Sequence, residues 1–271
     1  MPAPPPAPKG NRSPLLEFRN VTVFRGDRKL LDSLEVTLSE GEHIAILGPN
    51  GAGKSSFIRT ITRELYPRLD CGEVTFRVRG KDTWDVFDLR SGFGIVSNDL
   101  QYTFTRGITG REVVLSGFFS SVGLFNRAVT PEMEERADEI LGFLGIRQLG
   151  DRPMNAISSG EARRLLIGRA LVHGPATLIL DEPTNSLDLS ALHTLRQTLR
   201  KIARSGTGIV LVTHNLPDII PEITRVILMK DGRFVRDGPK EDLLTDRNIG
   251  DLFGIPVRVN RENGYYYATG Y

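Results

Sequence analysis

The chain has 271 residues, of which 39% are hydrophobic, so it is long enough to bury the core of one or two globular domains. It carries 35 Lys and Arg residues against 33 Asp and Glu residues, a net charge of +2. This balance disfavours nucleic acid as a partner, because nucleic-acid-binding proteins concentrate basic residues on one face. No stretch reaches the roughly 18–20 consecutive apolar residues of a membrane helix, and the first residues lack the apolar segment of a secretory signal. The single cysteine, Cys71, excludes an internal disulfide and suits the reducing cytoplasm.

The N-terminal part of the chain divides into a tail and a series of strands. Residues 1–14 are rich in Pro and Ala and are expected to form an extended tail, because such a run cannot bury a core. Residues 15–271 are expected to form one folded domain. Apolar and polar residues alternate at residues 16–23, 35–38 and 74–78, which predicts exposed-face strands. The apolar runs at residues 43–47 and 93–97 predict buried strands.

The rest of the chain alternates helical and strand patterns. Residues 111–173 are helical in pattern, and we expect an inserted helical subdomain at about residues 95–165. The continuous apolar runs at residues 178–180 and 209–212 suit parallel strands covered on both faces. Asp231-Gly232 and Asn263-Gly264 favour tight turns, the second in a C-terminal hairpin at residues 256–269. The pattern predicts an α/β core with an antiparallel β layer and an inserted helical subdomain.

A glycine-rich segment follows the strand expected at residues 43–47 and matches the pattern G-x-x-x-x-G-K-[ST]. Its glycines allow backbone N–H groups to surround phosphate oxygens, and the helix that follows adds the positive end of its dipole. Lys54 is expected to reach the β- and γ-phosphates of ATP, and Ser55 to bind Mg²⁺. The strand–loop–helix context disfavours an ordinary glycine turn. The expected nucleotide-binding residues are Gly48, Pro49, Asn50, Gly51, Ala52, Gly53, Lys54, Ser55 and Ser56.

Two acidic residues, Asp181 and Glu182, follow the strand expected at residues 178–180. In P-loop enzymes an acid at the end of such a strand supports Mg²⁺, the role expected of Asp181. Glu182 can then orient or deprotonate the attacking water. Paired acids also occur as ordinary charges at the start of a helix, so this interpretation depends on the P-loop.

The residues Ser158, Ser159, Gly160 and Glu161 precede an apolar helical segment. Ser158 and Glu161 fit the capping box of a helix N-terminus. A helix start made of serine and glycine can also bind a phosphate group. The residues alone leave both interpretations open.

The order of these motifs resembles that of the ABC ATPases over about residues 15–245. The family has a P-loop, a glutamine-containing switch loop, an LSGGQ-like signature, a strand ending in Asp-Glu, a loop ending in Leu-Asp, and a switch histidine. This chain supplies the P-loop, a switch region near Asn98, the signature-like segment at residues 157–161, Asp181-Glu182, Ser186-Leu187-Asp188, and His214.

The resemblance implies a mechanism as well as a fold. Two subunits, identical or paired, would enclose two ATP molecules, with the P-loop of each facing the Ser158 segment of the other. His214 would contact the γ-phosphate, and Asp188 would lie at the dimer interface. The implied activity is ATP hydrolysis with ATP and Mg²⁺ as ligands.

The sequence departs from the family at two places. The switch loop has Asn98 where glutamine is usual, and Gln101 follows three residues later. Asn98 is the aligned candidate for binding Mg²⁺ or water, but Gln101 is also able to do this after a local shift. The aromatic residue that stacks on adenine is replaced by Arg25, with Phe24 beside it; either side chain can lie flat on a base.

Three segments, at residues 96–101, 113–124 and 221–225, are similar to the ModF-like branch of ABC ATPases. Two functions fit this resemblance. The first is a motor that powers a transporter through a separate membrane permease, docked near residues 98–127 at the cytoplasmic face of the membrane. The second is a soluble ABC ATPase with a regulatory or repair role. A chromosome-type ATPase is disfavoured, because only about 100 residues separate Ser55 from Ser158 and no long heptad array fills them.

Overall fold

The computed structural model describes residues 13–69, 72–85, 89, 92–97, 104, 107–124 and 127–271. An antiparallel three-stranded sheet is built from β1 (Pro14–Arg25), β2 (Arg28–Ser39) and β4 (Thr75–Val78), in the order β2-β1-β4. Strands β1 and β2 form a long hairpin whose turn includes Gly26, at φ 59°. This sheet is the expected antiparallel layer.

The central sheet has six strands in the order β5-β6-β7-β3-β8-β9. Its strands are β3 (His43–Leu47), β5 (Phe93–Val96), β6 (Thr177–Asp181), β7 (Gly208–Thr213), β8 (Arg225–Lys230) and β9 (Arg233–Pro239). The first five in this order run parallel, and β9 pairs antiparallel with β8. Asp231 and Gly232 join β8 to β9 with φ of 49° and 77°, as a tight hairpin turn requires.

Both faces of the central sheet are covered, because successive residues on a strand point to opposite faces. Ile44 and Ile46 of β3 face a core shared with the antiparallel sheet and with α1 (Lys54–Ile61). Ala45 and Leu47 face a second core, shared with the helices on the other side. A strand buried on both faces is a continuous apolar run, which explains why the sequence pattern identified β3, β6 and β7.

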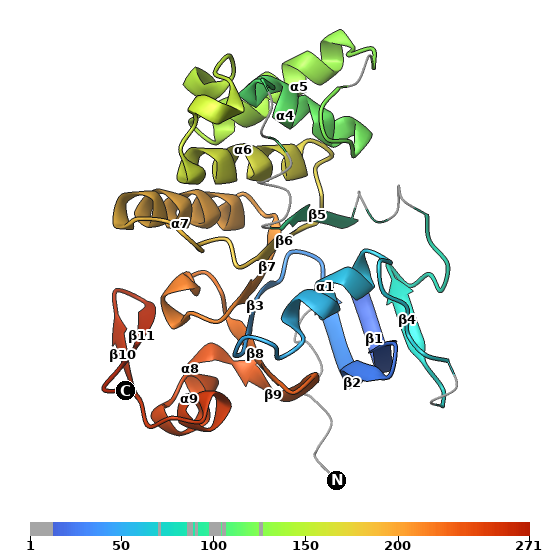
Figure 1. The fold of residues 1–271 in the computed structure, drawn as a ribbon, viewed down its shortest axis with the longest axis vertical. Coiled ribbons are helices and arrows are strands. Elements are labelled where there is room, and N and C mark those ends of the chain that lie inside the picture. Colours follow the sequence, from blue (N-terminus) through green and yellow to red (C-terminus); the bar gives the residue numbers. More distant parts are fainter. Residues whose placement is uncertain are drawn as a thin grey trace.

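The helices between β5 and β6 in the sequence stack above the central sheet (Figure 1). They are α4 (Gly110–Ser116), α5 (Pro131–Phe143) and α6 (Ser159–Leu171), with the short 3₁₀ helices η1 (Gly117–Phe119), η2 (Arg147–Leu149) and η3 (Met154–Ala156). Helix α7 (Leu189–Arg204) lies between α6 and the sheet. Helix α6 packs tightly on β5, since a Cβ at Gly94 would come within 2.5 Å of the Ala170 carbonyl oxygen.

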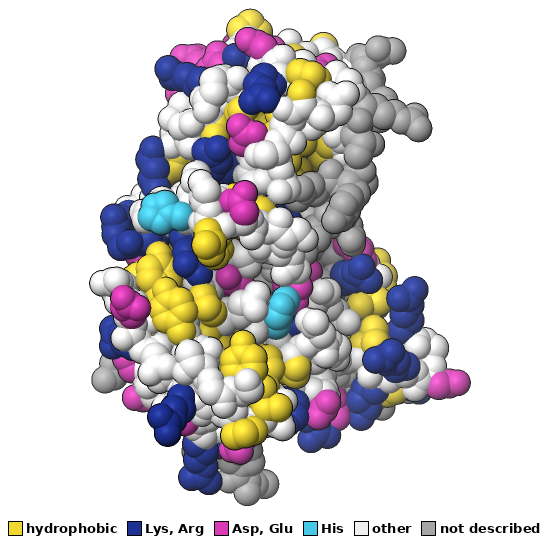
Figure 2. Space-filling model, turned by 60° about the vertical axis from the view of Figure 1, so that its left-hand side comes forward, with side chains coloured by type: hydrophobic (Ala, Val, Ile, Leu, Met, Phe, Trp, Pro, Cys, Tyr) yellow, Lys and Arg dark blue, Asp and Glu magenta, His cyan; other side chains and the backbone are white. Residues whose placement is uncertain are grey.

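After the 3₁₀ helix η4 (Leu216–Asp218) and β8–β9, the chain forms α8 (Lys240–Leu243), α9 (Asp246–Phe253) and a hairpin of β10 (Arg258–Glu262) and β11 (Tyr265–Thr269). The sequence patterns do not predict α8 or α9, because four and eight residues are too few for a clear helical period. Hydrophobic side chains gather on the lower half of the face in Figure 2. Ile255, directly after α9, and Tyr271, after the hairpin, are exposed. Within the described residues, no helix combines the length and apolar character needed to cross a membrane.

Candidate functional site

The glycine-rich loop joins β3 to α1 and is shaped by two glycines in the left-handed region, Gly51 (φ 81°) and Gly53 (φ 106°). Gly53 is the N-cap residue of α1, and no side chain caps this helix end. The first N–H groups of α1 are therefore available for an anion, as the positive end of the helix dipole favours. A side chain at Gly48 would force the backbone to shift, because a Cβ there would lie 2.1 Å from the Met229 carbonyl oxygen.

Lys54, the first residue of α1, folds back over the loop that precedes it. Its Nζ donates hydrogen bonds to the carbonyl oxygens of Gly48 (2.9 Å) and Pro49 (3.0 Å), and the side chain is buried. The same Nζ lies 3.4 Å from Glu182 Oε1. The ammonium group thus stands between the phosphate-binding loop and the acid at the end of β6.

Glu182 is held from several sides. Its backbone, in the left-handed region at φ 46°, donates from its N–H to the Val212 carbonyl oxygen on β7 (2.8 Å). Oε2 accepts from Asn185 Nδ2 at 2.7 Å, and Oε1 lies 3.0 Å from His214 Nδ1. Because an ionised carboxylate only accepts hydrogen bonds, Nδ1 of His214 carries the proton. A residue held in this sparsely populated conformation is typical of a functional position.

The surroundings of Glu182 favour its charged form. Burial alone would raise the pKa of this carboxyl, but the hydrogen bonds from His214 and Asn185 and the positive charge of Lys54 outweigh it, so the pKa is lowered. Glu182 is therefore ionised at neutral pH and able to accept a proton or a hydrogen bond from water.

A cavity of about 720 Å³ opens over these residues. It lies at the carboxyl ends of the parallel strands, where ligands bind in open α/β sheets. Its described lining includes the loop residues Asn50, Gly51, Gly53, Lys54, Ser55 and Ser56, together with Asp181, Glu182 and Ser97. Ser55 and Asp181, the expected Mg²⁺ residues, thus line the same cavity.

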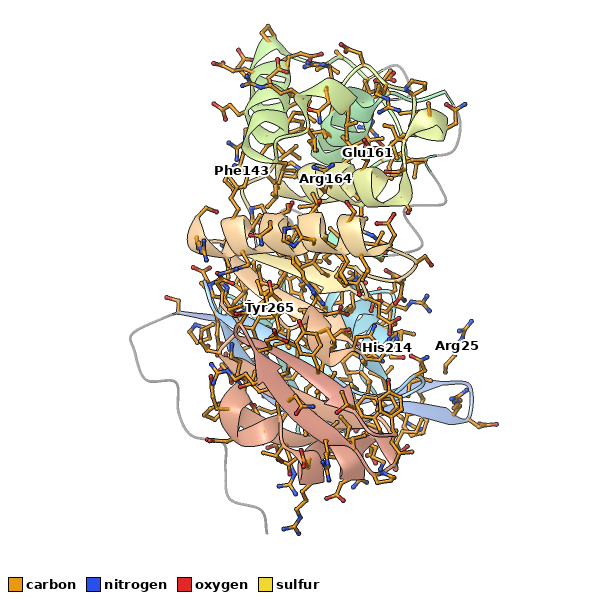
Figure 3. The ribbon with its side chains drawn as sticks, turned by 90° about the vertical axis from the view of Figure 1, so that its left-hand side faces the viewer. Arg25, Phe143, Glu161, Arg164, His214 and Tyr265 are labelled. Atoms are coloured by element: carbon orange, nitrogen blue, oxygen red, sulfur yellow. The ribbon has the colours of Figure 1, made fainter. Side chains whose placement is uncertain are left out.

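The residues expected to stack on adenine do not line this cavity. Phe24 pairs with Lys29 and Arg25 with Arg28 across the β1–β2 hairpin, and the lining comes from the returning strand at Arg28, Lys29 and Leu30. The Phe24 ring instead packs beneath two cations, Arg68 (5.0 Å) and Lys29 (5.8 Å). Arg25 is exposed near the hairpin tip (Figure 3).

The signature-like segment lies outside the cavity, at the N-terminus of α6. Ser158 Oγ accepts from the Glu161 N–H, and Glu161 Oε2 accepts from the Ser158 N–H at 2.9 Å, which completes a capping box. Hydrogen bonds from the backbone and side chain of Ser158 lower the pKa of Glu161. Figure 3 shows Glu161 in the upper, helical half of the molecule and His214 in the lower half. Asp188, exposed, caps α7 by accepting from the Ala191 N–H at 2.8 Å.

The structure also adds residues that the sequence patterns did not single out. Asn185, Thr184 and Asp218 all lie around the Glu182 and His214 pair. Asn185 and Thr184 follow the two acids directly in the chain, which is the signal that could have pointed to them. The switch-loop candidates Asn98 and Gln101 lie outside the described residues.

A glycine loop between a buried strand and a helix, with acids at the end of a neighbouring parallel strand, defines a P-loop ATPase. Comparison with known proteins narrows this class. Residues 31–185 match the model of the family described as ABC transporter. The chain is 32% identical to the hemin import ATP-binding protein HmuV of Bradyrhizobium diazoefficiens over 94% of each chain. It is 33% identical to the ABC transporter ATP-binding protein ModF of Escherichia coli, over 82% of this chain and 46% of ModF.

Solved structures agree with this result. The ADP conformation of MJ1267, an ATP-binding cassette of an ABC transporter, has a TM-score of 0.75 at 24% identity and covers 89% of this chain and 98% of its own. The dimeric post-hydrolysis state of the cassette MJ0796, bound to ADP and Pi, has a TM-score of 0.67 at 26% identity, covering 83% and 98%. The chain belongs to the ABC transporter family, as an ATP-binding and ATP-hydrolysing subunit. The expected fold class and the resemblance to ABC ATPases, including ModF, are confirmed.

Proposed function

We propose that the cavity binds ATP with Mg²⁺ and that hydrolysis takes place beside Glu182. The uncapped end of α1 and the left-handed glycines 51 and 53 support a phosphate site there. Ser55 and Asp181, which both line the cavity, would hold Mg²⁺ there, since hydroxyl and carboxylate oxygens are ligands it prefers. Bound Mg²⁺ would supply positive charge to the phosphate oxygens during transfer.

The observation that carries this proposal is the convergence of three residues, Lys54 at the start of α1, Glu182 directly after β6 and His214 directly after β7. Lys54 would attract the β- and γ-phosphates and pass from its present carbonyl acceptors to phosphate oxygens. Glu182, ionised, would orient the attacking water or take its proton. His214 would hold Glu182 in position and contact the γ-phosphate. The switch-loop amide, from Asn98 or Gln101, stays a prediction of the sequence.

We further propose that two copies, or this chain and a paired ABC subunit, enclose the nucleotides between them. The residues Ser158, Ser159, Gly160 and Glu161 do not line the described cavity of their own chain, so they would act on the P-loop of the other. The dimeric MJ0796 cassette, similar over 83% of this chain, supports this arrangement. Asp188, exposed at the start of α7, would lie at the interface.

The relatives support transport as the work that hydrolysis drives, since HmuV is named for hemin import. We propose that the dimer docks on a membrane permease from the cytoplasmic side, through the region near residues 98–127. The ATPase rate should therefore rise when a candidate permease, in detergent or lipid vesicles, is added to the purified chain. An unchanged rate with a permease encoded beside this gene would favour the non-transport role.

The ATP site itself is tested by Lys54→Ala. Lys54 Nζ bonds two carbonyl oxygens of the loop and is the charge proposed to meet the phosphates, so the variant should bind Mg-ATP more weakly and lose turnover. Lys230→Ala is a matched control, because Lys230 bonds the Asp251 carbonyl oxygen at an exposed position. Titration with a fluorescent ATP analogue and a phosphate-release assay measure the two effects. Near-normal turnover in Lys54→Ala would overturn the P-loop assignment.

A further inference from the structure

Asp218, in η4, is a buried carboxylate that joins the two loops carrying Glu182 and His214. Its Oδ2 accepts a hydrogen bond from Thr184 Oγ1 at 2.7 Å and another from Thr213 Oγ1 at 2.5 Å. Asp218 is only 4% exposed and Thr213 is fully buried. One oxygen atom therefore connects two segments of the chain, because Thr184 and Thr213 are 29 residues apart in the sequence.

The two threonines that bond Asp218 are close in sequence to Glu182 and His214. Thr184 follows Glu182 by two residues, and Thr213 directly precedes His214. The Thr213 hydroxyl also accepts from the Asn215 N–H at 3.0 Å, so it fixes the backbone on both sides of His214. Any shift of one loop relative to the other would change the 3.0 Å distance between Glu182 Oε1 and His214 Nδ1.

Arg196 and the C-terminal hairpin also support the Asp218 carboxylate. Burial raises the pKa of Asp218, while the two hydroxyl donors and the positive charge of Arg196 oppose this rise. The guanidinium of Arg196, on α7, lies 4.9 Å from the centre of the Tyr265 ring, so this residue of β11 connects the hairpin to α7 (Figure 3). Strand β11 packs on η4, and the turn at Gly264 abuts Pro221. The C-terminal hairpin thus braces the segment that contains Asp218.

We propose that Asp218 is a positioning residue, which sets the distance between Glu182 and His214 through Thr184 and Thr213. This inference rests on the roles proposed above for Glu182 and His214. The β10–β11 hairpin would also have a role, since it would keep η4 in place although it lies outside the nucleotide cavity.

The two threonines allow a sharper test than Asp218 itself. Thr184→Val keeps the shape of the side chain and removes the donor to Asp218, whereas Thr184→Ser keeps the donor. Thr184→Val should lower kcat about tenfold or more, since a misplacement of about 1 Å costs up to 10²-fold. ATP affinity should stay within about twofold of the wild type, because Thr184 is not a lining residue of the cavity. Thr184→Ser, which keeps the hydroxyl donor, should have a kcat close to that of the wild type.

Two further variants separate the possible outcomes. Glu182→Gln alone tests the proposed function, and active Glu182→Gln would overturn that function. If Glu182→Gln is inactive but Thr184→Val has the wild-type kcat, only the present inference fails. The double variant Glu182→Gln with Thr184→Val should have the same kcat as Glu182→Gln alone, because Thr184 acts through Glu182. A multiplicative loss in the double variant would also overturn the inference.

A structural control completes the experiment. Asp237→Asn removes one carboxylate of the half-buried cluster around Arg225, between β8 and β9, and should lower the unfolding midpoint without changing kcat per folded molecule. Thr184→Val should do the opposite, lowering kcat at nearly unchanged stability. If Thr184→Val behaved like Asp237→Asn, the contact would be structural and the proposal would be wrong.

Discussion

Glu182 keeps its negative charge in a half-buried position because His214, Asn185 and Lys54 surround it. A carboxylate whose pKa is lowered in the folded state stabilises the fold above its unfolded pKa. That contribution is lost as the pH falls through the folded pKa. The same charged carboxylate would act on a water molecule beside it. Stability and activity therefore both depend on the ionisation of Glu182.

Asn185→Ala should separate the contribution of one of these neighbours. Removing the amide that donates to Glu182 Oε2 raises the pKa of Glu182, so the acid limb of the profile of kcat against pH should move to higher pH. Measuring kcat at saturating ATP across the acid range checks this. Asn248→Ala is the control, because Asn248 bonds the carbonyl oxygens of Asp242 and Leu243. An unshifted acid limb in Asn185→Ala would show that Asn185 does not support the charge.

At the residue scale, the sequence predicted the parts of the site that follow from local geometry. The P-loop and the Asp181-Glu182 pair could be read because each is a fixed spacing after an apolar strand. The role of Asp218 could not be predicted, because it depends on contacts with Thr184 and Thr213 that only the folded chain creates. Phe24 and Arg25 are predicted from spacing alone. The cross-strand register of the hairpin puts the returning strand at the cavity, and stacking on adenine by either residue stays a prediction.

At the scale of the elements, α6 and α7 meet at Gly160. A Cβ at this position would come within 2.7 Å of the Ala191 Cβ in the first turn of α7. The signature-like segment is therefore packed against the segment that begins at Asp188. A change in the spacing of these helices would move Ser158 and Asp188 together.

Gly160→Ala should lower the free energy of unfolding by about 1–3 kcal/mol through overlap, offset in part by the better helix propensity of alanine. Adding Ala191→Gly should relieve the overlap, so the double variant should lose less than the sum of the single changes by about 0.5 kcal/mol or more. Urea unfolding of the four proteins measures this coupling. Additive losses would mean that the helices separate without strain at this contact.

The sequence predicted the elements best where burial is uniform along them. Strands β3, β6 and β7 are apolar on both faces and were placed within one or two residues. The Asp231-Gly232 and Asn263-Gly264 turns were found because few residues adopt their positive φ angles readily. Helices α8 and α9 were missed, since they are short and packed by tertiary contacts that no local pattern records.

At the scale of the whole molecule, the described cavity holds one half of the expected site. Lys54, Glu182 and His214 converge beside it, whereas the Ser158 segment caps α6 in the helical half (Figure 3). A nucleotide in this cavity would present its γ-phosphate outward, to whatever covers that face. In the dimer proposed above, a second copy would supply the helix N-terminus that the phosphate favours.

Glu182→Gln should trap that second copy. The variant keeps the shape of the side chain and should bind ATP, but hydrolysis should slow by roughly 10²–10⁴-fold because the amide cannot take a proton. The closed dimer then decays slowly, and light scattering with saturating ATP should give a mass near twice 30.1 kDa. Glu182→Gln combined with Lys54→Ala is the control and should stay near 30.1 kDa, since it no longer holds ATP tightly. A monomeric Glu182→Gln at saturating ATP would contradict the enclosed dimer, because ATP would then be bound without the Ser158 segment of a partner.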